Sequence, residues 1–253
     1  RVYNLVGSEW QKIGQDIDGE AATDYSGASV SLSADGTTVA IGAFLNDSDS
    51  GHVRVYTVVG SEWQKIGQDI DGEAAVDVSG WSVSLSADGT TVAIGAYGND
   101  DNGSSSGHVR VYNLVDSEWQ KLGQDIDGEA NGDEFGLSVS LSGDGKTVAI
   151  GAPSNDGNGV ASGHVRVFNF VGSENQWQKI GQDIDGEAAD RSGWSVSLSA
   201  DGTTVAIGAI FNNGNGNNSG HVRVYTVVGS EWQQIGQDID GEAACDGSGW
   251  SVS

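Results

Sequence analysis

The chain is built from one repeated segment, and this repeat limits the possible folds more than any other feature. Each copy runs from GHVRVY through WQKIGQDIDGEA to SVSLSADGTTVAIGA, at intervals of 53 to 57 residues. The modules start near one recurring arginine: Arg1, Arg54, Arg110, Arg166 and Arg223. A period of this length is typical of a propeller or a solenoid, so we interpret residues 1–253 as a single domain of modules.

One module, read from Ser29 onward, predicts four consecutive strands, here named A to D. Residues 29–33 alternate polar and apolar side chains and lead into Asp35-Gly36, the signal of a two-residue hairpin turn, so strand B follows at residues 37–43. After a polar B–C loop, residues 52–59 predict strand C and residues 63–70 predict strand D. Four strands in this order are expected to form one antiparallel meander.

A sheet with apolar residues on both faces needs like sheets on either side, as in the blades of a propeller. We therefore predict an all-β fold: a β-propeller of four-stranded antiparallel blades, with about five blades visible, four of them complete and one split into terminal pieces. Alternate connections of a meander leave the same side. The B–C loops and D–A linkers should therefore form one rim, here called the BC/DA rim, which should hold most of the acidic residues.

The ends of the sequence suggest a piece of something larger. The chain lacks methionine and opens in the middle of a module, so we expect a fragment of a longer polypeptide and of a larger propeller. A five-bladed ring with an incomplete closing blade and an open stack of sheets are the alternatives. Free strand edges at both ends would invite pairing with missing chain or with a second copy.

The charge balance argues against two classes of partner. Eleven Lys and Arg residues stand against 36 Asp and Glu residues, which gives a net charge of -25. Nucleic acids and anionic lipid surfaces need clustered cationic side chains, so neither is an expected partner. The acidic surface favours cations or basic partners, or it serves solubility alone. The single cysteine, Cys245, has no disulfide partner in the chain, and no signal peptide or membrane-spanning apolar run is recognisable.

The third module resembles a known repeat. Phe135-Gly136, followed by Gly151-Ala152-Pro153, is similar to the FG-GAP repeat of integrin α-subunit propellers and of many bacterial and algal surface proteins. The resemblance implies a β-propeller, a cell-surface setting and, in integrin-type blades, a calcium loop of the form D-x-D-x-D-G between strands A and B. The turn here is Ser-Ala-Asp-Gly or Ser-Gly-Asp-Gly, as at residues 142–145, too short to supply six to eight oxygen ligands. That calcium site is therefore not carried over.

Two sets of acidic residues remain candidate ligands for Ca²⁺, which is the only cofactor considered. The first set lies in the B–C loops and comprises Asp47, Asp49, Asp100, Asp101 and Asp156. The second lies in strand D and the D–A linker and comprises Asp69, Asp71, Glu73 and Asp77. Carboxylate oxygens on a flexible backbone suit calcium. The alternative is structural: such acids accept backbone N–H groups at turns or pair with Arg and Lys of the strands.

Three other residue types were weighed as sites. Four histidines open the C strands one blade apart, too far for a single ion to gather, and are interpreted as strand-edge residues: His52, His108, His164 and His221. Three tryptophans follow a Ser-Gly pair and either stack on sugar rings or pack as partly buried apolar residues: Trp81, Trp194 and Trp250. Three asparagines of the B–C loops begin acceptor sequences for N-glycosylation in a secreted eukaryotic protein: Asn46, Asn102 and Asn217.

The sequence favours binding over catalysis. It contains no recognisable pairing of a nucleophile with a base, and Cys245 stands at a position that varies between modules. We predict a non-catalytic adhesion or scaffold module, extracellular or at the cell surface, that binds a protein or glycan through the BC/DA rim, also within a repetitive assembly. The alternative is a propeller lectin with repeated shallow sugar sites.

Overall fold

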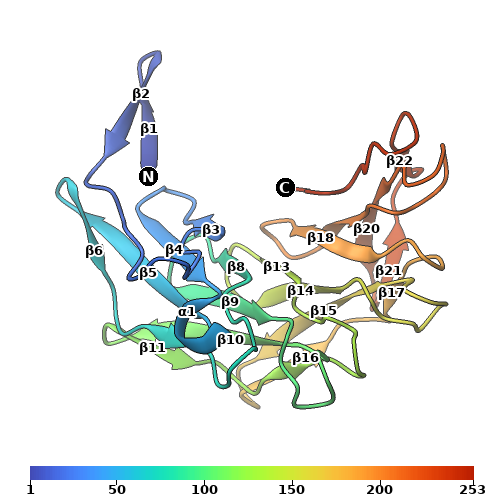
Figure 1. Cartoon of the computed structure of the whole chain (residues 1–253), viewed down its shortest axis with the longest axis horizontal. Coiled ribbons are helices and arrows are strands. Elements are labelled where there is room, and N and C mark those ends of the chain that lie inside the picture. Colours follow the sequence, from blue (N-terminus) through green and yellow to red (C-terminus); the bar gives the residue numbers. More distant parts are fainter.

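Each complete blade is an antiparallel meander of four strands, and four such blades follow one another around an open arc (Figure 1). The computed structural model describes all residues, 1–253. In the first blade, strands A to D are β3 (Ser29–Leu32), β4 (Thr38–Ala43), β5 (His52–Val59) and β6 (Glu62–Lys65). The predicted all-β fold of four-stranded blades is confirmed, with four blades complete.

The other three blades repeat this order. The second contains β8 (Ser82–Leu85), β9 (Thr91–Ala96), β10 (His108–Val115) and β11 (Glu118–Lys121). The third contains β13 (Ser138–Leu141), β14 (Thr147–Ala152), β15 (His164–Val171) and β16 (Gln176–Lys179). The fourth contains β18 (Ser192–Leu198), β19 (Thr204–Ala209), β20 (His221–Val228) and β21 (Glu231–Gln234).

Strand D is interrupted in every complete blade, so the prediction of a continuous strand over residues 63–70 is wrong. Gly67 adopts a φ of +72°, which turns the main chain out of the sheet after β6. The chain then returns as β7 (Ile70–Asp71), which pairs with the start of β5. The equivalent segments are β12 (Ile126–Asp127), β17 (Ile184–Asp185) and β22 (Ile239–Asp240).

The A–B turn is also longer than the two residues predicted. Four residues, 34–37, separate Ser33 from Thr38, which pair across the hairpin. The side chain of Asp35 organises this loop, because its Oδ1 accepts hydrogen bonds from Ser33 Oγ at 2.7 Å and from the Thr37 N–H at 2.9 Å. The Asp-Gly pair therefore signals the hairpin but not its length.

One B–C loop contains a helical turn that the sequence analysis did not expect. This element, α1 (Asn46–Asp49), lies in the first blade. Asp47 and Ser48 have φ values of 47° and 62°, so the segment is a pair of tight turns rather than a regular helix. No helix in the structure is both long and apolar enough to span a membrane.

Strand A of each blade lies innermost and packs against strand A of the next blade. The hydroxyl of Ser31 in β3 accepts the N–H of Leu85 in β8 at 2.9 Å. Glycine permits this approach: a Cβ on Gly42 would lie 2.1 Å from the carbonyl oxygen of Gly80 in the next blade. Gly80 itself has a φ of +85°. The recurring Ser-Gly or Phe-Gly and Gly-Ala pairs are therefore needed where neighbouring blades meet.

The hydrophobic core lies between blades rather than within them. One cluster joins Val53 and Val55 of the first blade to Leu85 and Val92 of the second. A second cluster joins the second and third blades, and a third joins the third and fourth. The second and third sheets are thus stabilised by neighbours that cover both of their faces.

A tryptophan of strand D fastens each blade to the one before it, and we call this contact the tryptophan lock. Trp119 donates its Nε1–H to the carbonyl of Ile66 at 2.9 Å and lies against Gly67, while Gln68 makes two hydrogen bonds to the Trp119 main chain, at 2.7 and 3.0 Å. The interruption of strand D places Gly67 and Gln68 for this contact. The same lock is made by three further tryptophans: Trp63, Trp177 and Trp232.

The two ends of the chain differ from the complete blades. At the N-terminus, β1 (Val2–Val6) and β2 (Glu9–Ile13) pair as a hairpin equivalent to strands C and D alone. Trp10 of this hairpin is 70% exposed, whereas Trp119 is 3% exposed. At the C-terminus, residues 250–253 form no strand, although they carry the sequence that starts strand A elsewhere.

Candidate functional site

Four largely buried arginines, one per complete blade, bind acidic residues of strand D and of the preceding D–A linker. Arg54 Nη2 lies 2.7 Å from Asp69 Oδ2 and also binds Glu20 of the linker. Lys65 binds the other oxygen of Asp69 at 2.6 Å. The set recurs as Arg110 with Glu73 and Asp125, Arg166 with Glu129 and Asp183, and Arg223 with Glu187 and Asp238.

These ion pairs hold the strand D carboxylates in the ionised form. Hydrogen bonds from Arg54 and then from Lys65 outweigh burial and lower the pKa of Asp69 to about 2. Burial acts to raise the pKa of Asp183, but the hydrogen bonds from Arg166 and Lys179 outweigh it and lower the value to about 2. Such a carboxylate is a poor proton donor at neutral pH, so the arrangement stabilises structure rather than supplying an acid.

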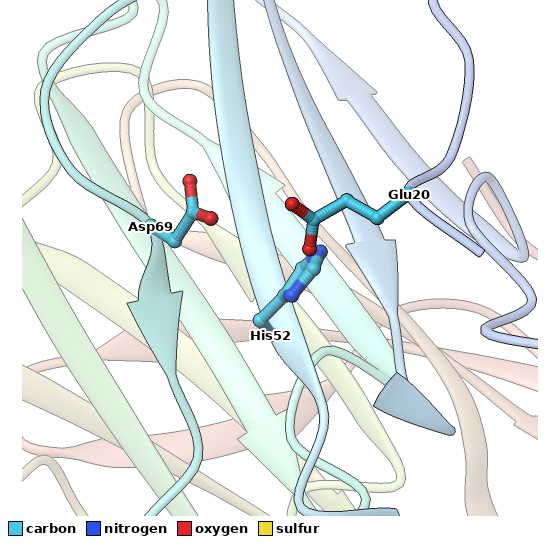
Figure 2. A group of neighbouring side chains, drawn as sticks. All are labelled: Glu20, His52 and Asp69. Atoms are coloured by element: carbon cyan, nitrogen blue, oxygen red, sulfur yellow. The ribbon is translucent and has the colours of Figure 1, made fainter. Parts of the chain in front are cut away.

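The four histidines stand at the start of strand C, as expected, but they are buried. Each is the first residue of strand C, between strands B and D, and only 2–3% of its surface is exposed. Burial lowers the pKa of His164 to about 4, so its ring is neutral. Figure 2 shows His52 with the carboxylates of Glu20 and Asp69 near its ring. The equivalent groups are Glu73, Asp101 and His108; Glu129, His164 and Asp183; and His221, Asp238 and Asp240.

These groups of ligand atoms, each within 4.8 Å of one another, do not fit a metal centre. At least one carboxylate of every group is already bound by an arginine, as Glu20 and Asp69 are by Arg54. A divalent cation would have to stand beside this fixed positive charge. The A–B turns do not fit calcium either, since one oxygen of Asp35 is occupied by the Ser33 hydroxyl and the Thr37 amide.

Two of the five predicted calcium ligands of the B–C loops, Asp100 and Asp156, are acceptors for the loop backbone. Asp100 Oδ1 accepts the N–H of Ser105 at 2.7 Å, and Asp156 Oδ1 accepts the N–H of Ala161 at 2.7 Å. Asn213 accepts an equivalent bond at 2.8 Å in the fourth blade. Because an amide replaces the carboxylate there, the position requires an acceptor and not a charge. The structure does not bring Asp47, Asp49 and Asp71 into any histidine group, whereas Asp101 joins Glu73 and His108.

Asp77 connects the two kinds of loop that form the BC/DA rim. It is 3% exposed, and its Oδ2 accepts hydrogen bonds from the Ala74 N–H and from Asn99 Nδ2 in the B–C loop, both at 3.2 Å. The pair recurs in the other blades, and burial raises the pKa of its equivalents Asp133 and Asp190. This residue therefore braces the rim from within.

The BC/DA rim carries a row of aromatic side chains. Trp81 lies at the centre, with its ring centroid 4.7 Å from that of Phe44 and 5.0 Å from that of Tyr97. Tyr25 extends the row at 5.6 Å from Phe44 and is 60% exposed. Phe44, Trp81 and Ala28 line a shallow hollow of about 220 Å³. The row combines the D–A end of one blade with the B–C loop of the next.

A second aromatic group lies on the same rim around the fourth blade. Trp194 lies between Phe211 and Trp250, with centroid separations of 6.4 and 5.3 Å. Trp250 is 67% exposed and lines a hollow of about 350 Å³ with Phe211 and Asp246. The third blade interrupts the aromatic series, because it has Leu137 and Pro153 where the second blade has Trp81 and Tyr97. The three tryptophans singled out from the sequence thus fall into two separate groups.

The three acceptor asparagines all lie on the BC/DA rim. Asn102 and Asn217 are exposed, and Asn102 donates to the carbonyl of Gly128 at 3.0 Å. Asn46 is half-buried and donates to Asp24 at 3.2 Å. A glycan would therefore meet an open surface at Asn217 and an existing contact at Asn46.

Sequence reasoning missed two parts of this rim. Each arginine-centred group joins residues from three segments. Nothing in the sequence around Arg54 or Glu20 indicates that these two residues lie together. The aromatic row was missed because Phe44 and Tyr97 stand where the third module has Pro153 of the repeat signature, and the sequence analysis did not consider that position as part of a site. Their common position directly after strand B, beside tryptophans that precede strand A, was a signal that could have placed them together.

Solved structures of several propeller-like proteins resemble the chain. The periplasmic gluconolactonase of Pseudomonas aeruginosa has a TM-score of 0.60 at 15% identity, over 94% of this chain and 63% of that one. A Bacteroides uniformis protein described as a 6-phosphogluconolactonase has a TM-score of 0.57 at 17% identity, over 84% and 56%. Hydrazine synthase of Kuenenia stuttgartiensis has a TM-score of 0.53 at 14% identity, over 82% and 53%. At these identities the likeness concerns the fold alone.

The chain is similar to just over half the length of these proteins, since it covers 53% to 63% of them. No curated protein matches the sequence. The family model of the FG-GAP repeat matches three consecutive stretches, residues 69–112, 124–168 and 176–225. These stretches make up more than half of the chain, and each runs from strand D of one module to strand C of the next. The expected resemblance is confirmed: the chain belongs to the FG-GAP repeat family of β-propellers.

Proposed function

We propose that the chain is a non-catalytic recognition module that binds protein partners through the BC/DA rim, in an adhesion or scaffold role. The observation that carries the proposal is the aromatic row of Tyr25, Phe44, Trp81 and Tyr97 on an acidic rim. Exposed aromatic side chains surrounded by polar residues are typical of the centre of a protein interface. Single exposed apolar residues need no explanation, but a contiguous row of them does.

The charge of the rim supports a basic partner. Nine of the eleven Lys and Arg side chains are held within ion pairs, so most of the acidic excess has no cation beside it. Asp100 of a B–C loop lines the same hollow as Tyr97 of the aromatic row. The opposite rim carries one aspartate in each A–B turn and one or two acids in each C–D turn. A basic surface would meet both the rings and the carboxylates.

The absence of a catalytic role is part of the proposal and has structural support. None of the histidines donates to or accepts from a serine, threonine or cysteine side chain, and each is buried beside an arginine. The largest hollow, about 520 Å³, lies beside the N-terminal hairpin and is lined mainly by apolar residues. An extracellular or cell-surface location is likewise proposed, on the family resemblance and the acidic surface.

The experiment compares the two rims by charge neutralisation. Binding of the chain to immobilised poly-L-lysine and to a panel of basic peptides is measured as salt is raised. The triple variant D47N/D100N/D101N neutralises the BC/DA rim, while E62Q/E118Q/E231Q neutralises the opposite rim by the same charge. Asparagine keeps the acceptor that Asp100 provides, as Asn213 does in the fourth blade. We expect the first variant to weaken binding several-fold more than the second, and equal losses would contradict the proposal.

Carbohydrate binding is the second candidate, because Trp81 and Trp250 expose ring surface beside polar groups. Stacking of a sugar on an exposed aromatic face, with Asp246 and Asn218 close by, would suit a shallow lectin site. A glycan array tests sugar binding, and a parallel array with EDTA shows whether any binding depends on calcium. Specific glycan binding that W81A or W250A abolishes would favour the lectin over the basic protein partner.

A further inference from the structure

A polar hollow of about 410 Å³ lies between the second and third blades, and we call it the interblade hollow. One wall is the stretch from Gln124 to Glu129 of the second blade, which includes β12, together with Asn102 of a B–C loop. The other wall is made by Arg166 and Phe168 of β15 and by Lys179 of β16. None of these residues belongs to the aromatic row, so the hollow is a separate place in the fold.

Side chains of both charges face the interblade hollow. Asp125, Asp127 and Glu129 lie on the wall of the second blade, and Arg166 and Lys179 lie on the wall of the third. A cationic ligand would therefore meet two cations of the protein, and an anionic ligand would meet three carboxylates. A neutral ligand that has both hydrogen-bond donors and acceptors meets neither obstacle.

Arg166 has donors that the protein does not use. Its guanidinium group carries five N–H donors, and its two ion pairs, with Glu129 and Asp183, are both made by Nη2. The side chain is 8% exposed, and its buried Nε has no hydrogen-bond partner. Because an unsatisfied buried donor costs free energy, a ligand whose oxygen atoms accept hydrogen bonds from this guanidinium would be bound favourably.

Phe168 distinguishes the third blade from the others at the position beside this arginine. The other four modules have a tyrosine there: Tyr3, Tyr56, Tyr112 and Tyr225. Burial raises the pKa of Tyr112, while Arg110, which lies beside its hydroxyl, acts to lower it, and Tyr225 stands in the same relation to Arg223. Neither Tyr112 nor Tyr225 lines a hollow. The interblade hollow is therefore found where the tyrosine hydroxyl is missing.

We propose that the interblade hollow binds a neutral polyhydroxylated ligand, a sugar or a polyol, with one hydroxyl in the place that the tyrosine hydroxyl takes in the neighbouring blades. A hydroxyl group can accept a hydrogen bond from Arg166 and donate one to a carboxylate, which suits walls of mixed charge. The half-buried ring of Phe168 offers an apolar surface for the C–H groups of such a ligand. The site differs from that of the lectin alternative, in which a sugar would stack on Trp81 or Trp250.

The test measures binding of uncharged sugars to the whole chain by isothermal titration calorimetry. The probes are the methyl glycosides of glucose, galactose, mannose and N-acetylglucosamine, with glycerol and inositol as polyols that are not sugars. F168Y supplies the hydroxyl from the protein itself, as the neighbouring blades do. We expect it to weaken binding at least about tenfold, because the new hydroxyl takes both the space and the hydrogen bond of the ligand.

Y112F is the reverse change and should create a second site beside Arg110, seen as a higher ratio of bound sugar to protein. The interface of the first and second blades has the same residue types in strand D, in the D–A linker and in strand C, apart from this tyrosine. Y25F removes a hydroxyl from an exposed tyrosine of the aromatic row and serves as the matched control, with binding as in the wild type. Thermal unfolding checks that the three variants fold.

The inference would be overturned if none of the probes bound the wild type, or if F168Y bound them as the wild type does. It would also be overturned if Y112F bound no more sugar than Y25F. Glucuronic acid and glucosamine should bind more weakly than glucose, and tighter binding of either would exclude a neutral ligand. Binding of uncharged sugars should not change with salt, whereas binding of a basic partner at the BC/DA rim should weaken, so failure of one proposal is distinguishable from failure of the other.

Discussion

The N-terminal hairpin and the interior hairpin of β10 and β11 have almost the same sequence but very different surroundings. Trp10 is 70% exposed and Trp119 is 3% exposed, although both follow a glutamate and precede Gln-Lys. The difference comes from the preceding blade, which covers Trp119 and is missing for Trp10. The repeated residues therefore form the interfaces between blades. A module buries its apolar side chains, and gains the stability this gives, only when a neighbouring blade is present.

The largest difference in stability between the two hairpins is expected when the tryptophan itself is removed. W119A should lower the free energy of unfolding by roughly 3–5 kcal/mol, because it deletes a buried ring from the interface between two blades. W10A should change the stability of the monomer by less than about 0.5 kcal/mol. Urea denaturation of both variants at low protein concentration measures the contrast. If W10A lowered the free energy of unfolding as much as W119A does, Trp10 could not be exposed as the structure shows.

Removing an interior arginine should cost nearly as much. In R166M the carboxylates of Asp183 and Glu129 lose their buried cation, although Lys179 still pairs with Asp183 and Glu129 is partly solvated. We expect a loss of about 2–3 kcal/mol for R166M. The terminal counterpart R1M should cost within about 0.5 kcal/mol, since Arg1 is 64% exposed in its pair with Asp16. Comparable losses in the two variants would contradict an interior role for the arginine.

The buried histidines make the complete blades sensitive to acid. The pKa of His164 is lowered to about 4 by burial, and the unfolded chain has a value near about 6.5. The unfolded state therefore binds the proton first, so stability is complete above the unfolded value and declines as the pH falls from the unfolded to the folded value. H164Q should flatten this decline by roughly 2–3 kcal/mol.

A second decline should follow at lower pH. The pKa of Asp183 is lowered to about 2, so its contribution is present above the unfolded value near about 3.8 and is lost towards the folded value. Urea unfolding at a series of pH values measures both steps. The N-terminal hairpin has no histidine, so a truncated chain that lacks it should keep the same pH profile. A profile of H164Q that matched the wild type would count against the buried neutral ring.

Most of the fold could be predicted because the strands are specified by local sequence patterns. The alternation of Ser-Val-Ser-Leu and the runs of Thr-Val-Ala-Ile placed strands A and B within one residue, and their repetition implied face-to-face packing of like sheets. The interruption of strand D could not be predicted from residues 63–70, because its reason lies in the next blade, where Trp119 needs Gly67 and Gln68. The length of the A–B turn depended on side-chain bonds of Asp35 that no spacing rule contains.

The candidate site was harder to foresee than the fold. The acids of the rim were recognisable as a set, but their partners come from other modules: Arg110 binds Glu73 of the preceding linker, and Asn99 donates to Asp77. The burial of His52 follows from the strands on either side of it and not from its position at a strand start. The roles of residues that act within one blade could therefore be predicted from the sequence. The roles of residues that join two blades could not.

The smallest expected loss of stability concerns the glutamine of the tryptophan lock. Its replacement removes the hydrogen bonds of the lock and leaves the packing of the ring in place. Gln124 makes two hydrogen bonds to the main chain of Trp177, both at 3.0 Å, so Q124A should cost about 1–2 kcal/mol while the ring stays in place. Gln237, the equivalent on the fourth blade, has no tryptophan to bind, and Q237A should leave the monomer unchanged. Unfolding curves collected at low protein concentration compare the two. Equal losses of stability in Q124A and Q237A would contradict the role of this glutamine as a partner of the tryptophan.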